Sequence, residues 1–486
     1  MASSGPAYGS IAELQTAIRD GRTTVKGAVE GYLNVIQKQN ADLNAVTLTN
    51  HKAIEEAERL DNLPVDQRGP LFGVPILIKD QIETEGIATS FGSKTCKDYV
   101  PRRDAELIQK LKNAGAIVLG KTTMCDWAAG FFSASSLSGT TKHPIDPSRD
   151  PGGSSAGSGT AIAANMALTA IGGDTGGSIR LPSSFCGLVG VRVTPGRISR
   201  DGMSALVKTQ DTPGPMCRTV EDAARILDVI VGFDEKDDFT SINSFTGRSA
   251  LPDQFTNAVR QPFLEGKRLG VLREAFGTHK GINAVLDQTI SNLKNAGVEL
   301  IDVSIPGLED YKASTSPYIL RSKKDINSFL ESREELKHLR IEEIYQNGDY
   351  HPACDLIDML VKGPTDPFQS PHSAKHLTQK DEFQRVVASI FAKHNLDAMV
   401  YPTCTELAPK TQSVLDREFT HLPNTVIGSQ LLWTALSVPI GKTRDDRYPD
   451  DPELPVGLEI LGVPLSEERI LNIAAGVEAL QQKQRQ

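Results

Sequence analysis

Residues 151–197 read PGGSSAGSGTAIAANMALTAIGGDTGGSIRLPSSFCGLVGVRVTPGR and contain two clusters rich in glycine and serine. The clusters lie at 152–155 (GGSS) and 176–178 (GGS), and a run of small residues and an apolar run join them. Glycine lets the backbone adopt positive φ and approach a bound group closely. Successive N–H groups in such turns can hold an anion. The stretch therefore predicts a helix and a strand flanked by two loops that bind a ligand.

Short apolar runs alternate with helical patterns on both sides of this stretch. The expected strands are 74–78, 116–119, 298–303 and 397–401, and the expected helices include 105–114, 283–295 and 379–394. Repeated alternation of strand and helix is typical of α/β proteins with a largely parallel sheet. The sequence therefore predicts an α/β fold with one large mixed, mostly parallel β-sheet covered by helices.

Two other parts of the chain have a different pattern. Residues 1–60 are predicted to form a helical N-terminal arm, in which Ser10 and Glu13 have the spacing of a capping box. Residues 233–262 and 305–375 are irregular and polar, and we interpret them as insertions rather than as domain boundaries.

Composition and charge exclude several classes of protein. Hydrophobic residues make up 39% of the 486 and charged residues 23%, as in ordinary globular proteins. The net charge of −9 argues against nucleic acid or anionic membranes as partners. No apolar run reaches the roughly 18 residues of a membrane span, and the first residues lack the pattern of a signal peptide. We therefore expect a cytoplasmic protein.

The six cysteines are far apart and never occur as C-x-x-C, so we expect buried free thiols rather than disulfides or metal ligands. They are Cys96, Cys125, Cys186, Cys217, Cys354 and Cys404.

Three functional interpretations of the glycine–serine clusters are considered. A phosphate cradle requires a lysine after the glycines, which is absent. A nucleophile elbow, G-x-S-x-G, requires a second glycine that does not follow Ser178. The third is a serine nucleophile with a base other than histidine, since His143, the one histidine near the clusters, is interpreted as an ordinary loop residue.

Lys79 is the candidate base, because it directly follows the apolar run 74–78 and burial would lower its pKa. From the residues alone, a solvated Lys79–Asp80 pair at the end of the strand is the more common arrangement, and both interpretations stay open.

Residues 152–182 closely resemble the signature of the amidase signature family of serine hydrolases. The matching residues are Gly152, Gly153, Ser154, Ser155, Gly157, Ile162, Asp174, Gly176, Ser178, Ile179, Arg180 and Pro182. Ser154 and Ser178 also have the expected separation of 24 positions, whereas Ala156 stands where glycine or serine is usual. Further blocks that resemble the family, including GVPILIKD at 73–80 and LPVGLEILG at 454–462, extend the likeness over most of residues 65–480.

The resemblance implies a catalytic triad of Lys79, Ser154 and Ser178, with a cis peptide bond at Ser154 and an acyl-enzyme on Ser178. The implied oxyanion hole consists of the backbone N–H groups of Thr175, Gly176, Gly177 and Ser178. The implied substrate-binding residues are Ala128, Ser154 and Thr175, and the implied supporting residues are Ser155, Asp174 and Arg180. A plain buried ion pair is the alternative for the last two. No cofactor and no metal are implied.

The function implied by the resemblance is hydrolysis of a small-molecule or peptide-like amide. The alternatives are the A subunit of a glutamyl-tRNA amidotransferase and an allophanate-type hydrolase. Leu181 favours the stand-alone hydrolase, because the amidotransferase chain usually carries glutamine there. Residues 125–133 would pass the acyl pocket, where Trp127, Phe131 and Phe132 either line the pocket or belong to the core.

The resemblance also implies that residues 1–486 form a single domain, with 305–375 a variable insertion near the substrate entrance. We expect a small-molecule amide as the partner, and the family allows for a homodimer.

Overall fold

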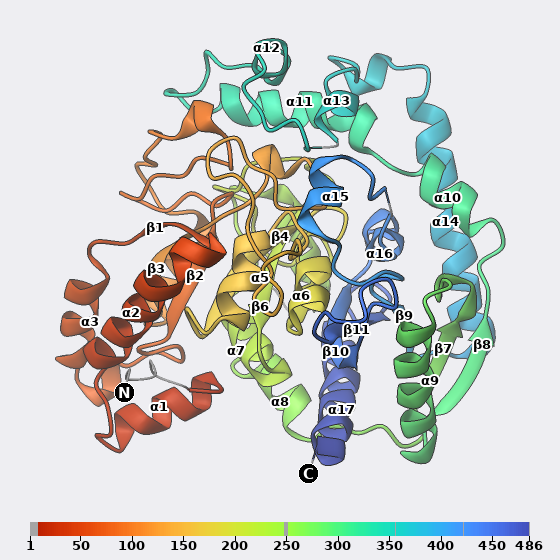
Figure 1. Ribbon diagram of the computed structural model, residues 1–486, viewed down its shortest axis with the longest axis horizontal. Coiled ribbons are helices and arrows are strands. Elements are labelled where there is room, and N and C mark those ends of the chain that lie inside the picture. The colour runs from red at the N-terminus through yellow and green to blue at the C-terminus, as the bar shows by residue number, and fades with distance from the viewer. Residues whose placement is uncertain (1–7, 247–250, 355, 421, 486) are drawn as a thin grey trace.

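The computed structural model describes residues 8–246, 251–354, 356–420 and 422–485, and its centre is a sheet of 11 strands (Figure 1). From one edge to the other, the order is β1 (Val46–Thr49), β3 (Ile117–Thr122), β2 (Pro75–Lys79), β4 (Thr169–Asp174), β6 (Thr212–Cys217), β5 (Val189–Arg192), β10 (Ala435–Thr443), β11 (Leu454–Leu461), β9 (Ala398–Pro402), β7 (Arg268–Leu272) and β8 (Glu299–Val303).

The strand directions confirm a mixed sheet in an α/β fold but not the expected majority of parallel pairs. Parallel pairing joins β2 to β3 and β4, and β7 to β8 and β9. The other six pairs of described strands are antiparallel. The expectation was wrong because apolar runs reveal buried strands without revealing their direction.

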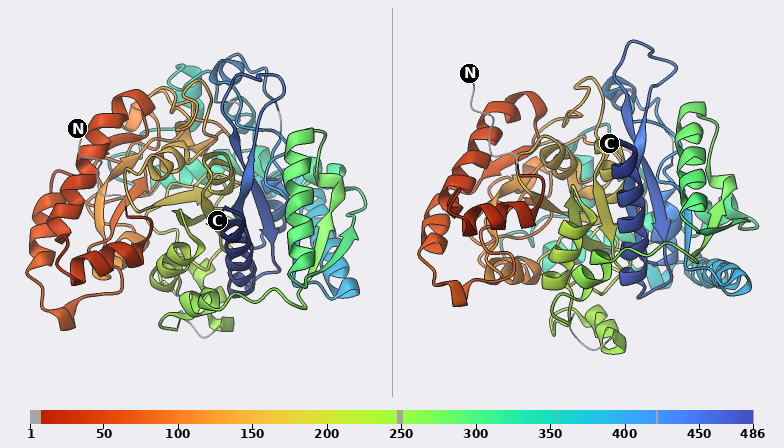
Figure 2. Two further views of the ribbon diagram at one scale, coloured as in Figure 1. Left: turned by 60° about the horizontal axis from the view of Figure 1, so that its bottom comes forward. Right: turned by 90° about the horizontal axis from the view of Figure 1, so that it is seen from below.

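Helices flank the sheet along its length. They are α1 (Ile11–Arg19), α2 (Val25–Leu43), α3 (Ala53–Asp61), α4 (Glu106–Asn113), α5 (Ala156–Ala163), α6 (Arg180–Cys186), α7 (Val220–Ile230), α8 (Gln254–Arg260), α9 (Lys280–Asn295), α10 (Leu308–Ser314), α11 (Tyr318–Glu331), α12 (Ile341–Gln346), α13 (Ile357–Leu360), α14 (Ser373–His394), α15 (Thr411–Leu415), α16 (Thr425–Leu431) and α17 (Glu467–Arg485). Short 3₁₀ helices occur at η1 (Val65–Gln67), η2 (Lys94–Cys96), η3 (Asp126–Ala128), η4 (Asp238–Thr246), η5 (Arg273–Ala275) and η6 (Pro367–Gln369). Figure 2 shows α17 running along β10.

The N-terminal arm is helical, as predicted, but it also contains a strand. Ser10 Oγ accepts a hydrogen bond from Glu13 N at 3.2 Å, which caps α1. Between α2 and α3, β1 pairs with β3, so this segment is joined to the edge of the sheet. Residues 1–7 of the predicted arm lie outside the described residues.

Residues 305–375 contain four complete helices, α10–α13, so the expectation of an irregular segment was wrong. In α11 the buried side chains include Tyr318, Ile326, Phe329 and Leu330, on a polar helix whose charged side chains make its apolar face hard to recognise. Residue 355 of this segment lies outside the described residues. Residues 233–262 likewise contain η4 and α8.

The core consists of one large hydrophobic cluster and a smaller one around β7, β9 and α14. All six cysteines are buried, as predicted, and none of them forms a disulfide with a described residue. In the described part of the chain, no helix has the length and apolarity needed to span a membrane. The same described residues contain no group of three or more His, Cys, Asp or Glu side chains that could hold a metal ion.

Candidate active site

The ends of two neighbouring parallel strands bring the predicted site residues together. β2 and β4 pair with Ile78 opposite Ile171, so Lys79 and Asp174, the last residues of these strands, lie at the same edge of the sheet. Residues 175–178 form the turn between β4 and α6. Ligand sites in α/β sheets characteristically lie beyond the carboxyl ends of such strands.

Lys79 is completely buried, which excludes the solvated arrangement left open by the sequence. Its Nζ lies 2.7 Å from Ser154 Oγ and 3.2 Å from the carbonyl oxygen of Gly173. Burial lowers the pKa of Lys79 to about 8, although Cys125, Asp174 and Asp211 act in the opposite direction. A lysine in this state is neutral often enough near pH 8 to accept a proton.

Ser154 lies in the loop that leads into α5, and the peptide bond between Gly153 and Ser154 is cis, as the resemblance implied. Gly153 N donates to the carbonyl oxygen of Phe131 at 2.7 Å, which fixes this loop against the 125–133 segment. Ser155 joins this loop to the Ser178 turn and to the end of β4. Its N–H donates to the carbonyl oxygen of Ser178, and its hydroxyl contacts Gly173, each at 3.3 Å.

Ser178 is 5% exposed and begins the turn into α6. Its hydroxyl forms no hydrogen bond with any described residue, so it is available to a bound substrate. The bond from Ser155 N to the Ser178 carbonyl oxygen places this serine beside the Ser154 loop.

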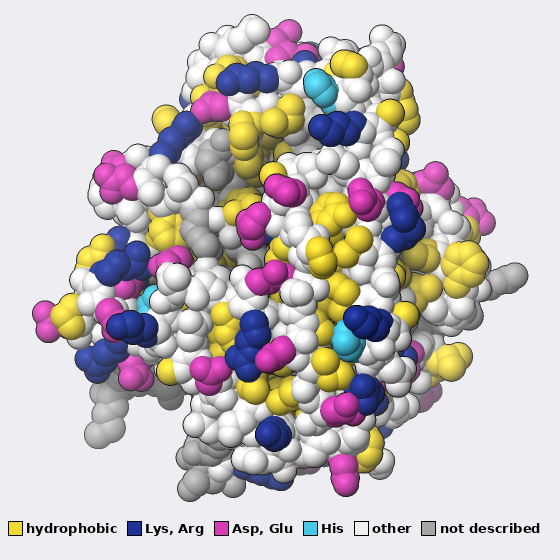
Figure 3. All heavy atoms as spheres, turned by 90° about the vertical axis from the view of Figure 1, so that its right-hand side faces the viewer, with side chains coloured by type: hydrophobic (Ala, Val, Ile, Leu, Met, Phe, Trp, Pro, Cys, Tyr) yellow, Lys and Arg dark blue, Asp and Glu magenta, His cyan; other side chains and the backbone are white. Residues whose placement is uncertain are grey.

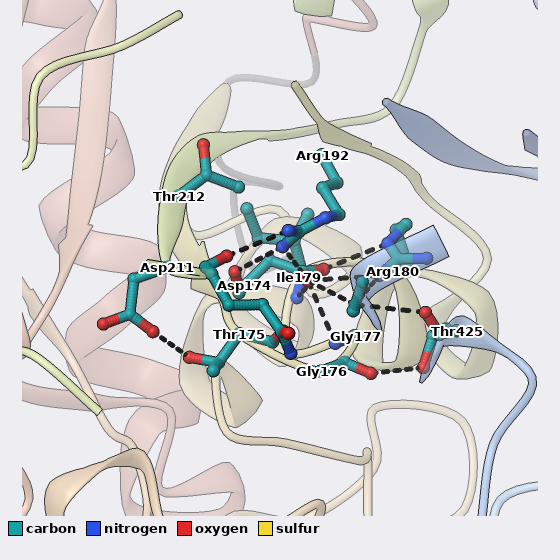
Figure 4. Close-up of polar contacts among 12 residues, drawn as sticks. Asp174, Thr175, Gly176, Gly177, Ile179, Arg180, Arg192, Asp211, Thr212 and Thr425 are labelled. Atoms are coloured by element: carbon teal, nitrogen blue, oxygen red, sulfur yellow. Dashed lines mark hydrogen bonds and ion pairs between the residues drawn. The ribbon is translucent and has the colours of Figure 1, made fainter. Parts of the chain in front are cut away.

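Asp174 occupies one of the four N–H groups expected to form an oxyanion hole. Gly177 N donates to Asp174 Oδ1 at 3.0 Å in this structure, and its place in the expected oxyanion hole stays a prediction (Figure 4). Thr175, Gly176 and Ser178 remain candidates, and the N–H groups of Gly176 and Ser178 donate to no described residue. Sequence matching could not reveal this, because it identifies a residue but not the direction of its N–H.

Only glycine fits at two positions of this turn. A Cβ atom at Gly176 would collide with the Tyr318 hydroxyl, and one at Gly177 would collide with the Thr425 side chain. Gly177 also has a φ of +131°, which L-residues rarely adopt. The Thr425 hydroxyl donates to the carbonyl oxygen of Gly176 at 2.8 Å, which fixes the turn from the side of α16.

Asp174 and Arg180 form a buried ion pair and also shape the turn, so the two interpretations of this pair do not exclude each other. Arg180 Nε lies 3.1 Å from Asp174 Oδ2, and its Nη1 contacts Glu459 Oε1. Arg192 Nη1 contacts Asp174 Oδ1 at 3.0 Å (Figure 4). Burial alone would raise the pKa of Asp174, but the two arginines outweigh burial and hold it well below its ordinary value.

We expect Arg180→Met to lower the free energy of unfolding by about 3–5 kcal/mol, because it leaves Asp174 and Glu459 buried without their shared partner. Urea denaturation measures the loss. Arg225→Met is the matched control, since its pair with Glu221 is partly exposed and such pairs contribute about 0–1 kcal/mol. Equal losses in the two variants would contradict a buried network.

Sequence reasoning missed three polar residues that hold the turn from behind. Arg192 donates to the carbonyl oxygens of Asp174 at 2.7 Å and Gln210 at 2.9 Å. Gln210 Nε2 donates to the carbonyl oxygen of Thr175 at 2.8 Å, and Asp211 accepts from the Thr175 hydroxyl at 2.5 Å. The one available signal was Arg192 itself, a charged residue at the end of the apolar run LVGVR.

The 125–133 segment contributes one aromatic ring to the site and one to the core. A Cβ atom at Gly176 would lie 3.3 Å from Phe131 Cζ, which places Phe131 beside the turn. Trp127 is buried and stacks on Phe91 with ring centroids 5.4 Å apart, as a core residue does. Ala128, the next residue, has a φ of +58°, and its role in substrate binding stays a prediction.

Phe132 and His143 have structural surroundings. Phe132 packs edge to face against Phe419, with ring centroids 5.5 Å apart. His143 is buried with Nε2 2.9 Å from the carbonyl oxygen of Phe185, and burial lowers its pKa to about 4. This histidine is therefore held between its own loop, where Ile145 N and Asp146 N donate to Nδ1, and α6, in agreement with the interpretation as a structural residue.

Comparisons with known proteins agree on one family. Residues 27–471 match the family model described as Amidase. The A subunit of glutamyl-tRNA(Gln) amidotransferase from Exiguobacterium sp. is 31% identical over 481 residues, which cover 96% of each chain.

Two solved structures share the fold. Native peptide amidase from Stenotrophomonas maltophilia superposes with a TM-score of 0.87 at 29% identity, over 98% of this chain and 97% of its own. The A subunit of glutamyl-tRNA(Gln) amidotransferase from Thermotoga maritima superposes with a TM-score of 0.76 at 25% identity, over 96% of this chain and 93% of its own.

Proposed function

Since the chain belongs to the amidase family, we propose that it hydrolyses a small-molecule or peptide-like amide through an acyl-enzyme on Ser178. The observation that carries the proposal is the 2.7 Å contact between Lys79 Nζ and Ser154 Oγ. It joins a buried lysine with a pKa of about 8 to a serine that lies beside the Ser178 turn.

Acylation begins when Ser178 Oγ attacks the carbonyl carbon of the amide. Its proton passes to Ser154 Oγ as Ser154 gives its own proton to neutral Lys79. The carbonyl π electrons move to oxygen, and N–H groups from the Thr175, Gly176 and Ser178 set stabilise the oxyanion. Preorganised donors of this kind typically contribute about 2.7–4 kcal/mol each to catalysis.

The intermediate collapses when the C–N bond breaks. The leaving nitrogen takes a proton from Ser154, which Lys79 reprotonates, so the amine departs neutral and the triad returns to its starting charge. Water then attacks the ester on Ser178 by the same route and releases a carboxylic acid. In acylation the transferred proton comes from Ser178, and in deacylation it comes from the attacking water and restores the Ser178 hydroxyl.

The superposition on peptide amidase supports a stand-alone hydrolase, since its TM-score and identity exceed those of the solved amidotransferase chain. Leu181 supports the same assignment.

The second candidate is the A subunit of an amidotransferase, which the sequence comparison favours more than the first. A tRNA-dependent enzyme needs basic surface for nucleic acid, and this could come from a partner chain. On the face shown in Figure 3, Lys and Arg side chains are interspersed with Asp and Glu and form no continuous basic surface.

Purified chain without partner proteins distinguishes the candidates. We expect it to release ammonia or amine from at least one member of a panel of peptide amides, aryl amides and allophanate, without glutamine, ATP or tRNA. Ser178→Ala protein, purified identically, controls for contaminating enzymes. Activity confined to glutamine and dependent on partner proteins and tRNA would contradict the hydrolase and support the amidotransferase.

A further inference from the structure

A cavity of about 370 Å³ lies between the first turns of α11 and α14 and the short helix η6. Its walls are mostly hydrophobic. The apolar side chains include Phe239, Pro317, Leu320, Phe368, Leu377 and Leu432. Phe368 is 83% exposed and Leu377 is 60% exposed, so both present large apolar surface at the mouth of the cavity. Ligand pockets for small molecules characteristically combine such walls with a few polar groups.

Lys380, on α14, is the distinctive polar group of this cavity. No hydrogen bond or ion pair joins it to any described residue. The acidic groups nearby are already paired: Asp381 contacts Arg385 at 3.0 Å, and Asp325 contacts Arg321 at 3.0 Å. His376 Nδ1 lies 3.3 Å from the carbonyl oxygen of Ser314. Among the residues that the structure describes, Lys380 is therefore a positive charge of the cavity without a counter-ion.

The surroundings of Lys380 favour an anion in a second way. Burial, together with the charges of Arg192 and Arg321, lowers the pKa of Lys380 to about 8. Lys380 is partly buried and has no negative partner among the described residues, which is unfavourable for a cation, and an anionic ligand would relieve this. The lysine is still largely protonated at neutral pH, so it can pair with that ligand.

We propose that this cavity binds a monocarboxylate with an apolar body, with the carboxylate on Lys380 and the body against Leu320, Phe368 and Leu377. One uncompensated charge matches one carboxylate. Phosphate is a poorer match, because Arg321, the arginine of the lining, is already paired with Asp325 and cannot add a free guanidinium to Lys380. The hydrophobic walls match an aromatic or medium-chain aliphatic acid. The ligand belongs to the class of acid that amide hydrolysis releases, and this link rests on the proposed function.

The cavity is separate from the active site but adjoins two segments that support it. Pro317 and Leu320 line the cavity, whereas Tyr318 between them lies against Gly176. Thr209 also lines the cavity, and the next residue, Gln210, donates to the carbonyl oxygen of Thr175. A bound acid would therefore contact the segments behind the Ser178 turn without touching Ser178.

Isothermal titration calorimetry on Ser178→Ala protein tests the site without turnover. Sodium benzoate and sodium hexanoate are the probes, with benzyl alcohol, hexanol and inorganic phosphate as comparisons, at concentrations up to about 10 mM. We expect at least one carboxylate to bind with a stoichiometry of one, and the neutral analogues and phosphate to bind at least tenfold more weakly.

Two added substitutions locate the binding. Lys380→Met should weaken it at least tenfold, whereas Lys375→Met, an exposed lysine on the same helix that does not line the cavity, should leave it unchanged. Leu320→Trp should also abolish binding by filling the cavity, which keeps the test decisive if Lys380→Met fails to fold. No carboxylate binding, or binding that survives both cavity variants, would overturn the site. Neither result bears on amide hydrolysis, which is measured separately.

Discussion

Ser178→Ala is expected to lower kcat for amide hydrolysis by about 10⁴-fold or more while the protein stays folded. The Ser178 hydroxyl forms no hydrogen bond with a described residue, so its removal costs little stability. The loss in rate is large because the proposed acyl-enzyme forms on this hydroxyl. Steady-state assays on the best amide of the panel measure kcat, and circular dichroism checks the fold.

Ser204→Ala is the matched control. Ser204 is also buried, and its hydroxyl lacks a hydrogen-bond partner among the described residues. Its removal should change kcat less than about twofold. If Ser178→Ala kept wild-type turnover, or if both variants lost activity equally, Ser178 would not be the nucleophile.

Lys79→Met is expected to lower kcat by about 10²–10⁴-fold, the usual contribution of a positioned base. The pH dependence is the more specific result. Because only neutral Lys79 accepts a proton, wild-type activity should rise as pH increases through about 8 and then level off. The residual activity of Lys79→Met should lack this rise.

Lys121 provides an unusually close control. It is also fully buried, and burial lowers its pKa to about 8, but its Nζ contacts Ile82, Thr84 and Thr89 rather than a serine. Lys121→Met should reduce stability, while the surviving folded enzyme keeps the rise in activity near pH 8. A Lys79→Met profile with an unchanged rise would contradict the role of Lys79 as the base.

Much of the fold was predictable because apolar periodicity reports burial directly. The runs 74–78 and 397–401 predict strands to within one residue. Strand direction was not predictable, since it depends on which strands become neighbours. The helices of residues 305–375 were missed because charged residues obscure their buried faces.

The residues of the candidate site were predictable where their neighbours in the sequence indicate the role of the side chain. Lys79 follows a buried strand, and Ser154 and Ser178 lie in glycine-rich turns that match a family signature. Contacts between distant segments were not predictable. Arg192 and Gln210 meet the turn from β5 and from the loop before β6, and the N–H of Gly177 points to Asp174.

The most direct measurement is the mass of the enzyme after brief exposure to an amide or ester of known acyl group, followed by peptide mapping. We expect an increase equal to the acyl group minus one hydrogen, located on the peptide that contains Ser178 and absent from Ser178→Ala. An adduct on another residue, or turnover of the substrate with no adduct even under rapid acid quench, would contradict an acyl-enzyme on Ser178.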